Sequence, residues 1–200
     1  MASADSETHT TPQEVIPQAV KVLVAGGFGA GKTTLVASVS EITPLSTEEV
    51  MTEASYGVDD LGGVEEKTTT TVALDFGRIT INDEVVLYLF GTPGQDRFWF
   101  MWDELAEGSL GAVVLADTRR LGTCFHAVDF FEGRGVPFVV AVNRFEGSTV
   151  YAEEEVREAL DIPSEVPVIT ADARERESGK LVLVELITHV IRGRNSTVRE

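Results

Sequence analysis

A glycine-rich segment that ends in lysine and threonine carries the clearest chemistry in this chain. Residues 26–33 read Gly-Gly-Phe-Gly-Ala-Gly-Lys-Thr, which matches the phosphate-binding pattern G-x-x-x-x-G-K-[ST]. Glycines let the backbone curl so that successive N–H groups point inward at phosphate oxygens. We expect Lys32 to reach the β- and γ-phosphates as a point charge and the Thr33 hydroxyl to bind magnesium. The pattern therefore predicts a nucleoside phosphate ligand.

The segments on either side of this loop are those that the motif requires. An apolar run at 20–25 predicts a strand before the loop, and the residues from Thr33 to about Ile42 suit a helix after it. That helix would direct the positive end of its dipole at the phosphates. An accidental glycine-rich turn would lack both elements. We expect nucleotide contacts from the whole loop and the threonine after it, namely Gly26, Gly27, Phe28, Gly29, Ala30, Gly31, Lys32, Thr33 and Thr34.

The rest of the chain alternates between apolar runs and helix-like segments, which is typical of a mostly parallel sheet with helices on both faces. Two apolar runs on either side of an Asn82-Asp83 turn predict one antiparallel hairpin. Further strands are expected at 111–116, 136–142 and 166–170, and helices near 121–134, 151–160 and 178–193. We therefore predict an α/β fold of the P-loop NTPase type, with a six-stranded mostly parallel sheet and about five flanking helices.

One domain spans residues 19–193 in this interpretation. Residues 1–18 are rich in Ser, Thr, Asp and Glu, which predicts a disordered N-terminal tail, and 194–200 are expected to form a flexible C-terminal tail. Residues 44–70 show little periodicity and many polar side chains. Because a long irregular segment inside a compact domain is often functional, we expect a role for it near the ligand.

Composition narrows the function classes and the compartment. The net charge of −17 argues against nucleic acid as a ligand and against direct binding to an anionic membrane. No apolar run approaches the roughly 18 residues of a membrane helix, and we find no signal peptide or lipidation motif. Cys124 is the only cysteine, so no internal disulfide is possible. We expect a cytoplasmic protein that would reach a membrane only through a partner.

A second candidate group follows the predicted hairpin. Thr92, Pro93, Gly94 and Gln95 come directly after Gly91, at a strand end of the kind where open α/β sheets bind ligands. Gly94 lacks a Cβ, so its N–H could approach a γ-phosphate, and Gln95 is placed to orient an attacking water. Alone these residues would predict only a turn. After a phosphate-binding loop and a strand they favour nucleotide hydrolysis.

This segment resembles the one that reads D-T-x-G-Q-E-R-F in the Ras-like small GTPases. The matching residues are Thr92, Gly94, Gln95, Arg97 and Phe98, with Asp96 in place of Glu. Gly91 stands where that family has an aspartate that supports the magnesium shell. The resemblance implies a Ras-like G domain that binds GTP and GDP with Mg²⁺. It also implies that metal affinity and hydrolysis rate depend on what replaces the missing carboxylate.

A threonine run precedes the first strand of the hairpin. The family pattern T-x-G-x-D-F falls on Thr71, Ala73, Asp75 and Phe76. The resemblance makes Thr71 the residue whose hydroxyl and backbone meet magnesium and the γ-phosphate, with Thr70 as the alternative. From the residues alone, such a run is simply β-prone. For Asp75 we favour a surface position on an edge strand over a second interpretation, in which it partly replaces the carboxylate missing at Gly91, through water.

Recognition of the base is predicted at two further strand ends. The segment Asn143-Arg144-Phe145-Glu146 resembles N-K-x-D, whose aspartate takes the two N–H donors of guanine. Arg144 can still stack on a base, and Glu146 keeps the charge one methylene further out. The segment Thr170-Ala171 resembles the start of the family's S-A-K motif, so the Ala171 N–H is expected at the guanine carbonyl. Nucleotide contacts are thus expected from Gly94, Asn143, Arg144, Glu146, Thr170 and Ala171.

The run over 87–103 is the most specific part of the resemblance. It is similar to the actinobacterial conservon GTPases, with the MglA group as more distant relatives. Conservon GTPases work beside a sensor-kinase-like membrane protein and a roadblock/LC7-type regulator, which implies a role in signalling. Residues 98–102 contain four aromatic side chains and a methionine, which cannot all face the core from one helix. An exposed part of this cluster would suit a partner surface.

These features predict a nucleotide-controlled switch with slow, partner-dependent GTP hydrolysis. Lys32, Thr71 and Gln95 are the expected catalytic residues, and Thr33 and Thr71 are the expected magnesium ligands. One alternative is a GTPase-like scaffold that binds nucleotide without useful hydrolysis, which Gly91 favours. Another is a P-loop ATPase or kinase, against which the Gln95 and Asn143 matches argue.

Overall fold

Seven strands form one sheet in the computed structural model, which describes residues 16–52, 69–94 and 96–197. The strands are β1 (Gln18–Gly26), β2 (Leu45–Thr52), β3 (Thr69–Thr80), β4 (Val85–Gly91), β5 (Ser109–Ala116), β6 (Phe138–Asn143) and β7 (Val168–Ala171). The α-helices are α1 (Lys32–Val39), α2 (Trp102–Ala106), α3 (Phe125–Arg134), α4 (Glu153–Leu160) and α5 (Arg176–Thr197). Two 3-10 segments, η1 (Asp96–Met101) and η2 (Thr118–Cys124), follow β4 and β5.

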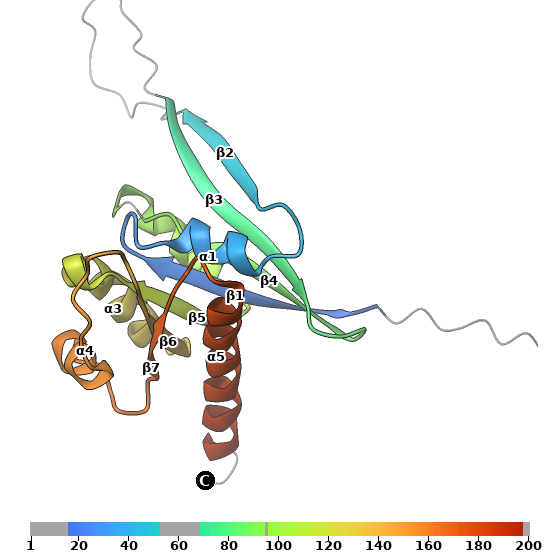
Figure 1. Cartoon of the computed structure of the whole chain (residues 1–200). Coiled ribbons are helices and arrows are strands. Elements are labelled where there is room, and N and C mark those ends of the chain that lie inside the picture. Colours follow the sequence, from blue (N-terminus) through green and yellow to red (C-terminus); the bar gives the residue numbers. More distant parts are fainter. Residues whose placement is uncertain (1–15, 53–68, 95, 198–200) are drawn as a thin grey trace, which may run out of the picture.

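The strand order is β2-β3-β4-β1-β5-β6-β7. The five strands β4, β1, β5, β6 and β7 are parallel, whereas β3 runs antiparallel to both β2 and β4. In Figure 1 the β2–β3 ribbon projects beyond the rest of the sheet, on the side of the molecule away from the C-terminal end of α5. Because β4, β1, β5, β6 and β7 are parallel, their carboxyl ends meet at one edge of the sheet, where ligands bind in sheets of this kind.

Alternate residues of the central strands pack against two separate helical layers. Val22 and Val24 of β1 belong to the core under α1 and α5, whereas Leu23 and Ala25 belong to the core under α3 and α4. All four side chains are fully buried. Because successive side chains of a strand point to opposite faces, a strand covered on both sides reads as a continuous apolar run. This explains why β1, β5 and β6 could be recognised from sequence.

The predicted α/β fold is confirmed, and the sheet has one strand more than expected. The additional strand is β2, which lies in the segment that we predicted to be irregular. Its sequence, Leu-Ser-Thr-Glu-Glu-Val-Met-Thr, lacks a regular alternation of apolar and polar residues. It pairs along its whole length with β3 and forms the outer edge of the sheet. An edge strand held by backbone pairing needs little apolar patterning, so periodicity did not identify it.

The ends of the domain differ slightly from prediction. Strand β1 begins at Gln18, and α5 continues to Thr197, into the segment expected to be a flexible tail. The predicted N-terminal tail lies almost entirely outside the described residues. Cys124 is fully buried, as expected of a small apolar side chain, and burial raises the pKa of its thiol to about 11. None of the described helices is long and apolar enough to cross a membrane.

Helices α1 and α5 approach each other closely at Gly179. A Cβ built on Gly179 would lie 2.5 Å from Cγ1 of Val39 and 3.0 Å from Cδ1 of Leu35, both of which are buried in α1. A Cβ built on Gly193, later in the same helix, would meet nothing within 4 Å. Both glycines are helical, so alanine raises the helix propensity equally at each. Because only position 179 lacks space for a Cβ, the two substitutions should change stability in opposite directions.

We predict that Gly179→Ala destabilises the domain by about 1–3 kcal/mol, because overpacking at Val39 outweighs the higher helix propensity of alanine. The matched control, Gly193→Ala, should stabilise it by about 0.5–1 kcal/mol, since only the propensity changes there. Urea denaturation of the two variants gives both values. Equal effects of the two substitutions would contradict the close α1–α5 packing.

Candidate nucleotide-binding site

The predicted phosphate-binding loop connects the end of β1 to the start of α1. Gly26, Gly29 and Gly31 have φ values of 137°, 74° and 104°, which lie in the region that glycine adopts without strain. Gly26 ends β1, and Gly31 directly precedes the first residue of α1. The positive end of the helix dipole is therefore directed into the loop. The sequence places its glycines where the curl of the backbone requires them.

Lys32 lies inside this loop and is buried. Its Nζ donates hydrogen bonds of 2.8 Å each to the carbonyl oxygens of Gly26 and Gly27. Burial lowers the pKa of Lys32 to about 8, and the nearby negative charge of Asp75 partly offsets that effect. A Cβ built on Gly94 would lie 2.5 Å from this Nζ and 3.0 Å from the Phe28 nitrogen. The loop after β4 therefore approaches the phosphate-binding loop to a distance that only glycine permits.

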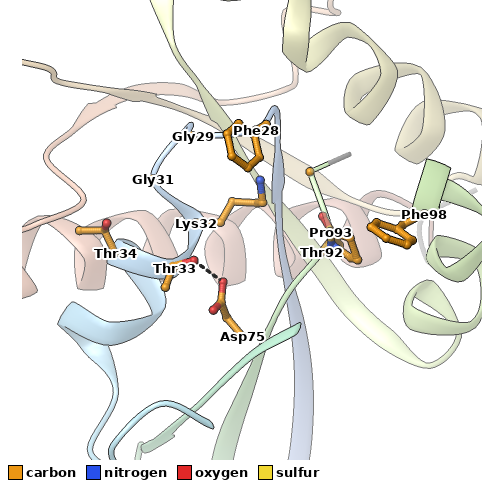
Figure 2. A pocket seen from close by; sticks show the side chains of 11 residues that line it. Phe28, Gly29, Gly31, Lys32, Thr33, Thr34, Asp75, Thr92, Pro93 and Phe98 are labelled. Carbon is orange, nitrogen blue, oxygen red and sulfur yellow. Dashed lines mark hydrogen bonds between the residues drawn. The ribbon is translucent and has the colours of Figure 1, made fainter. Parts of the chain in front are cut away.

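Thr33 is hydrogen-bonded to a carboxylate that we expected at the surface. Its hydroxyl donates to Oδ2 of Asp75 at 2.6 Å, and Figure 2 shows the pair beside Lys32. Asp75 is only 8% exposed, so the interpretation of this residue as a surface acid is wrong. The error has a physical cause: β2 pairs with β3, so β3 is not an edge strand, and the Asp75 side chain meets Thr33 at the start of α1.

Gly91 lies directly opposite Asp75 in the antiparallel β3–β4 pair. A Cβ built on Gly91 would lie 2.9 Å from both Cβ and Oδ2 of Asp75. A side chain at position 91 would therefore occupy the space that the Asp75 carboxylate fills. The second interpretation of Asp75, in which it replaces the carboxylate absent at Gly91, fits this geometry.

A cavity of about 360 Å³ opens above the loop. Its walls are Phe28, Gly29, Gly31, Lys32, Thr33, Thr34, Asp75, Thr92, Pro93, Gly94 and Phe98. Among the described residues, the buried hydroxyl of Thr92 has no hydrogen-bond partner. A buried polar atom usually has one, so this hydroxyl indicates a polar ligand or water in the cavity. The volume and the polar lining suit phosphate groups.

Asn143 holds the phosphate-binding loop to the neighbouring strand ends. It is 4% exposed, its Nδ2 donates to the Ala30 carbonyl at 2.9 Å, and its Oδ1 accepts from the Ala173 N–H at 3.0 Å. The side chain thus joins the loop after β1 to the loop after β7. Its role in this structure is to position both loops.

A smaller cavity of about 130 Å³ lies where the base-recognition residues were predicted. It is lined by Gly31, Thr34, Asn143, Arg144, Phe145, Glu146, Ala173 and Arg174. Thr170 and Ala171 instead belong to β7, where the Ala171 carbonyl accepts from the Arg144 N–H at 2.8 Å. Ala173 and Arg174 were not predicted. They lie two and three residues beyond the end of β7, and this position is the signal that would have identified them.

Three charged residues after β5 also border the site, and sequence reasoning missed them. Asp117 is almost fully buried and accepts from both Nε and Nη2 of Arg119, at 2.9 and 2.8 Å. These hydrogen bonds hold the pKa of Asp117 below its usual range. The Arg119 guanidinium lies over the ring of Phe145 at 3.8 Å, beside the smaller cavity. Arg120 donates from Nη2 to the carbonyl of Phe28 at 3.0 Å.

The described structure leaves one predicted catalytic residue untested and places another away from the cavity. Gln95 lies outside the described residues. Thr71 pairs with Val50 in the β2–β3 ribbon, four residues along the strand from Asp75, which corresponds to about 13 Å. The backbone therefore does not place Thr71 beside Thr33 in this conformation, because β3 extends away from the loop. The roles of Gln95 and Thr71 stay predictions.

Comparison with known proteins agrees with this geometry. A family model described as a conserved hypothetical ATP binding protein matches residues 24–193, from within β1 to near the end of α5. The chain belongs to that family. An uncharacterized protein of Methanocaldococcus jannaschii is 31% identical over 137 residues, which cover 68% of this chain and 76% of the relative. These conserved hypothetical ATP binding proteins share with the present chain a nucleotide-binding P-loop NTPase domain.

Two further similarities concern larger proteins. Translation initiation factor IF-2 of Salinibacter ruber is 26% identical over 152 residues, which cover 75% of this chain but 13% of the factor. The G domain of the T. maritima FeoB iron transporter superposes with a TM-score of 0.56 at 17% identity, over 88% of this chain and 98% of that domain. The structural similarity shows the fold, which is that of a small GTPase-like G domain.

We predict that Asn143→Ala costs about 2–4 kcal/mol of stability, because it leaves the buried Ala30 carbonyl and Ala173 N–H without partners. Asn143→Asp should cost at least as much, since a carboxylate oxygen in place of Nδ2 would face the Ala30 carbonyl oxygen and bury a charge. Urea denaturation of the two variants measures the difference. If both substitutions were neutral, the side chain would not hold the two loops together.

Proposed function

We propose that this protein is a small GTP-binding switch whose slow hydrolysis of GTP depends on a partner. The observation that carries the proposal is the hydrogen bond between Thr33 in the phosphate-binding loop and Asp75 in β3. Strand β3 pairs with β2, and the two form the ribbon that projects from the sheet. A change in what Thr33 contacts when nucleotide binds would therefore act on the ribbon. Such coupling between phosphate contacts and a movable element is how nucleotide switches work.

The residues around Thr33 fit a magnesium ion that accompanies the nucleotide. A hydroxyl and a carboxylate are oxygen ligands of the kind Mg²⁺ prefers, and the Thr92 hydroxyl is a buried polar group in the same cavity. Bound Mg²⁺ would neutralise charge on the β- and γ-phosphate oxygens. In this proposal the Thr33 hydroxyl would hold the ion, and Asp75 would orient that hydroxyl and add negative charge beside it. Asp75 would thus supply, beside the metal site, the carboxylate that Gly91 lacks.

We predict that Asp75→Asn reduces the effect of Mg²⁺ on GDP affinity by about 10- to 100-fold, which is typical when an outer carboxylate of a metal site is lost. Calorimetric titration of GDP with Mg²⁺ and with chelator measures this effect directly. Gly91→Asp alone should also impair it, because two carboxylates would compete for the same space. The double variant Asp75→Gly, Gly91→Asp moves the carboxylate across the strand pair.

The double variant provides the matched control in this series. Recovery of the Mg²⁺ effect in it, together with loss in both single variants, would support a carboxylate that acts from either strand. A protein in which Asp75→Asn leaves the Mg²⁺ effect intact would contradict the proposed role of Asp75. Urea denaturation of each variant separates loss of metal binding from loss of folding.

Preference for guanine is proposed to come from Glu146 and Arg144. Both residues are exposed and line the smaller cavity next to the phosphate-binding loop. A carboxylate accepts hydrogen bonds and can take two adjacent N–H donors, which guanine presents on its Watson–Crick edge and adenine does not. Arg144 can stack on the plane of a base. The description of the matched family names ATP instead, so the base must be determined by titration.

We predict that the protein binds GDP and GTP more tightly than ATP and that Glu146→Ala removes this preference. Lys32→Ala should abolish binding of all three nucleotides, whereas Lys180→Ala, on the surface of α5, should have no effect. Calorimetric titration with Mg²⁺ compares the three ligands. Equal affinity for ATP and GTP would indicate a general nucleotide-binding scaffold instead of a GTP switch. Unchanged nucleotide affinity in Lys32→Ala would refute the phosphate-binding assignment.

Hydrolysis in this proposal depends on positioning and on charge. Lys32 would contact the γ-phosphate, and the Gly94 N–H would donate a hydrogen bond to it. Gln95 would orient the attacking water. Thr71 would join the site when the nucleotide is bound. Without an arginine at the γ-phosphate, turnover should be about 10⁻⁴ s⁻¹. A scaffold without useful hydrolysis is the second candidate. Multiple-turnover phosphate release, with Gln95→Leu as the control, distinguishes the two.

The aromatic segment after β4 is a proposed partner surface. Phe98 and Trp102 are buried, whereas Phe100 is 61% exposed. Trp99 stacks on His126 with ring centroids 3.2 Å apart, so it belongs partly to the core. An exposed aromatic ring next to a nucleotide-sensitive loop suits recognition by a regulator. From the resemblance to conservon GTPases, we propose a roadblock/LC7-type regulator and a sensor-kinase-like membrane protein as partners of a cytoplasmic switch.

A further inference from the structure

Arg120 lies against the outer side of the phosphate-binding loop. Its Nη2 is 3.0 Å from the carbonyl oxygen of Phe28, and a Cβ built on Gly29 would lie 3.2 Å from the same atom. The Phe28–Gly29 peptide that it contacts forms part of the wall of the 360 Å³ cavity. Arg120 comes from η2, more than ninety positions further along the chain. The fold thus brings an arginine within one peptide group of the phosphate cradle.

The local structure holds Arg120 in place without using most of its donors. Asp117 accepts two short hydrogen bonds from Arg119, whereas its contact with Nη2 of Arg120 is longer, at 3.4 Å. A guanidinium has five N–H donors, and the contacts described for Arg120 all involve Nη2. Its side chain is 50% exposed. Arg120 can turn toward an anion in the cavity at the cost of this longer ion pair alone, because Asp117 keeps its shorter pair with Arg119.

Thr123 fixes the backbone from which Arg120 projects. Its hydroxyl donates to the Arg120 carbonyl at 2.8 Å. The same side chain lies so close to Gly27 that a Cβ there would clash with it. Segment η2 is thus packed directly on the phosphate-binding loop, and Arg120 cannot move away from it as a surface side chain on a loose loop could. A preorganised cation next to developing charge is the arrangement that stabilises a phosphoryl-transfer transition state.

We propose that Arg120 is an arginine supplied in cis, which contacts the γ-phosphate during hydrolysis. This inference rests on the proposed GTPase function. In the step, the water oxygen forms a bond to the γ-phosphorus, and the bond between that phosphorus and the β–γ bridging oxygen breaks. GDP leaves with the electron pair, and the protons of the water remain with inorganic phosphate and solvent. Arg120 donates hydrogen bonds to the oxygens on which negative charge accumulates.

A cis arginine changes the expected rate and the role of the partner. GTPases that lack such an arginine hydrolyse GTP at about 10⁻⁴ s⁻¹, whereas those with an arginine in cis reach about 10⁻² s⁻¹. If Arg120 has this role, single-turnover hydrolysis should be near the higher value without any partner. A partner would then not be needed to supply positive charge.

Formation of a transition-state analogue tests the proposal through binding as well as through rate. GDP with aluminium fluoride mimics the transferred phosphoryl group, and proteins bind such analogues tightly only when the charge-stabilising groups are present. Titrations with GDP alone and with GDP plus aluminium fluoride would use the full-length wild type and the variants Arg120→Ala, Arg120→Lys and Arg119→Ala. Arg119 is the matched control because it shares Asp117 but lies over Phe145.

We expect the wild type to bind GDP–aluminium fluoride without any partner protein. Arg120→Ala should lose this binding, while its affinity for GDP changes less than threefold. Arg120→Lys should recover it in part, and Arg119→Ala should weaken GDP and the analogue by the same factor. Single-turnover hydrolysis in Arg120→Ala should fall by about 100-fold or more.

Each other outcome overturns a defined part of the inference. Analogue binding that survives in Arg120→Ala would show that Arg120 only packs against the loop. A wild type that binds GDP but not the analogue would show that the arginine must come from another protein. Failure of the wild type to bind GDP at all would refute the proposed function itself, independently of Arg120.

Discussion

The hydrogen bond between Thr33 and Asp75 links two parts of the molecule that otherwise belong to different structural units. Thr33 lies at the start of α1, in the loop that cradles phosphate, and Asp75 lies in a strand that is antiparallel to most of the sheet. The bond is 2.6 Å long and involves a buried carboxylate, so it is of the strong, charge-assisted type. Any ligand that competes for either group must rearrange the other.

The distribution of charge around the cavity contrasts with that of the whole chain. The net charge is −17, yet Lys32, Arg119, Arg120, Arg144 and Arg174 all lie beside the two cavities at the strand ends. Asp75 and Glu146 line the same cavities, and Asp117 and Asp172 pair with Arg119, Arg120 and Arg174. The five cations near the cavities thus face four acids, whereas acids exceed cations by 17 over the whole chain. The acidic remainder of the surface would repel polyanions such as nucleic acid. The protein can therefore bind a small phosphate ester, such as a nucleotide, in preference to a nucleic acid.

Sequence reasoning predicted most of the fold and the phosphate-binding loop, because both depend on local patterns. Strands covered on two faces read as apolar runs, and three of the four loop glycines, Gly26, Gly29 and Gly31, have positive φ. Asp75 was misplaced because its burial comes from Thr33 and the Gly91 backbone, which only the tertiary fold brings to it. Asp117 and Arg120 were missed because only the tertiary fold brings η2 to the loop. Ala173 and Arg174 were missed because alignment to a short motif selected Thr170 and Ala171, which belong to β7.

The close contact between Gly91 and Asp75 also constrains how this protein can diverge. A lineage that acquired an acidic residue at position 91 while retaining Asp75 would place two like charges in one buried space. A lineage that lost Asp75 first would pass through a form with no carboxylate beside Thr33. Either order crosses an unfavourable intermediate, so the two positions should change together or not at all. Homologous chains should therefore fall into two groups, with the carboxylate on one strand or on its neighbour, and few chains should carry both or neither.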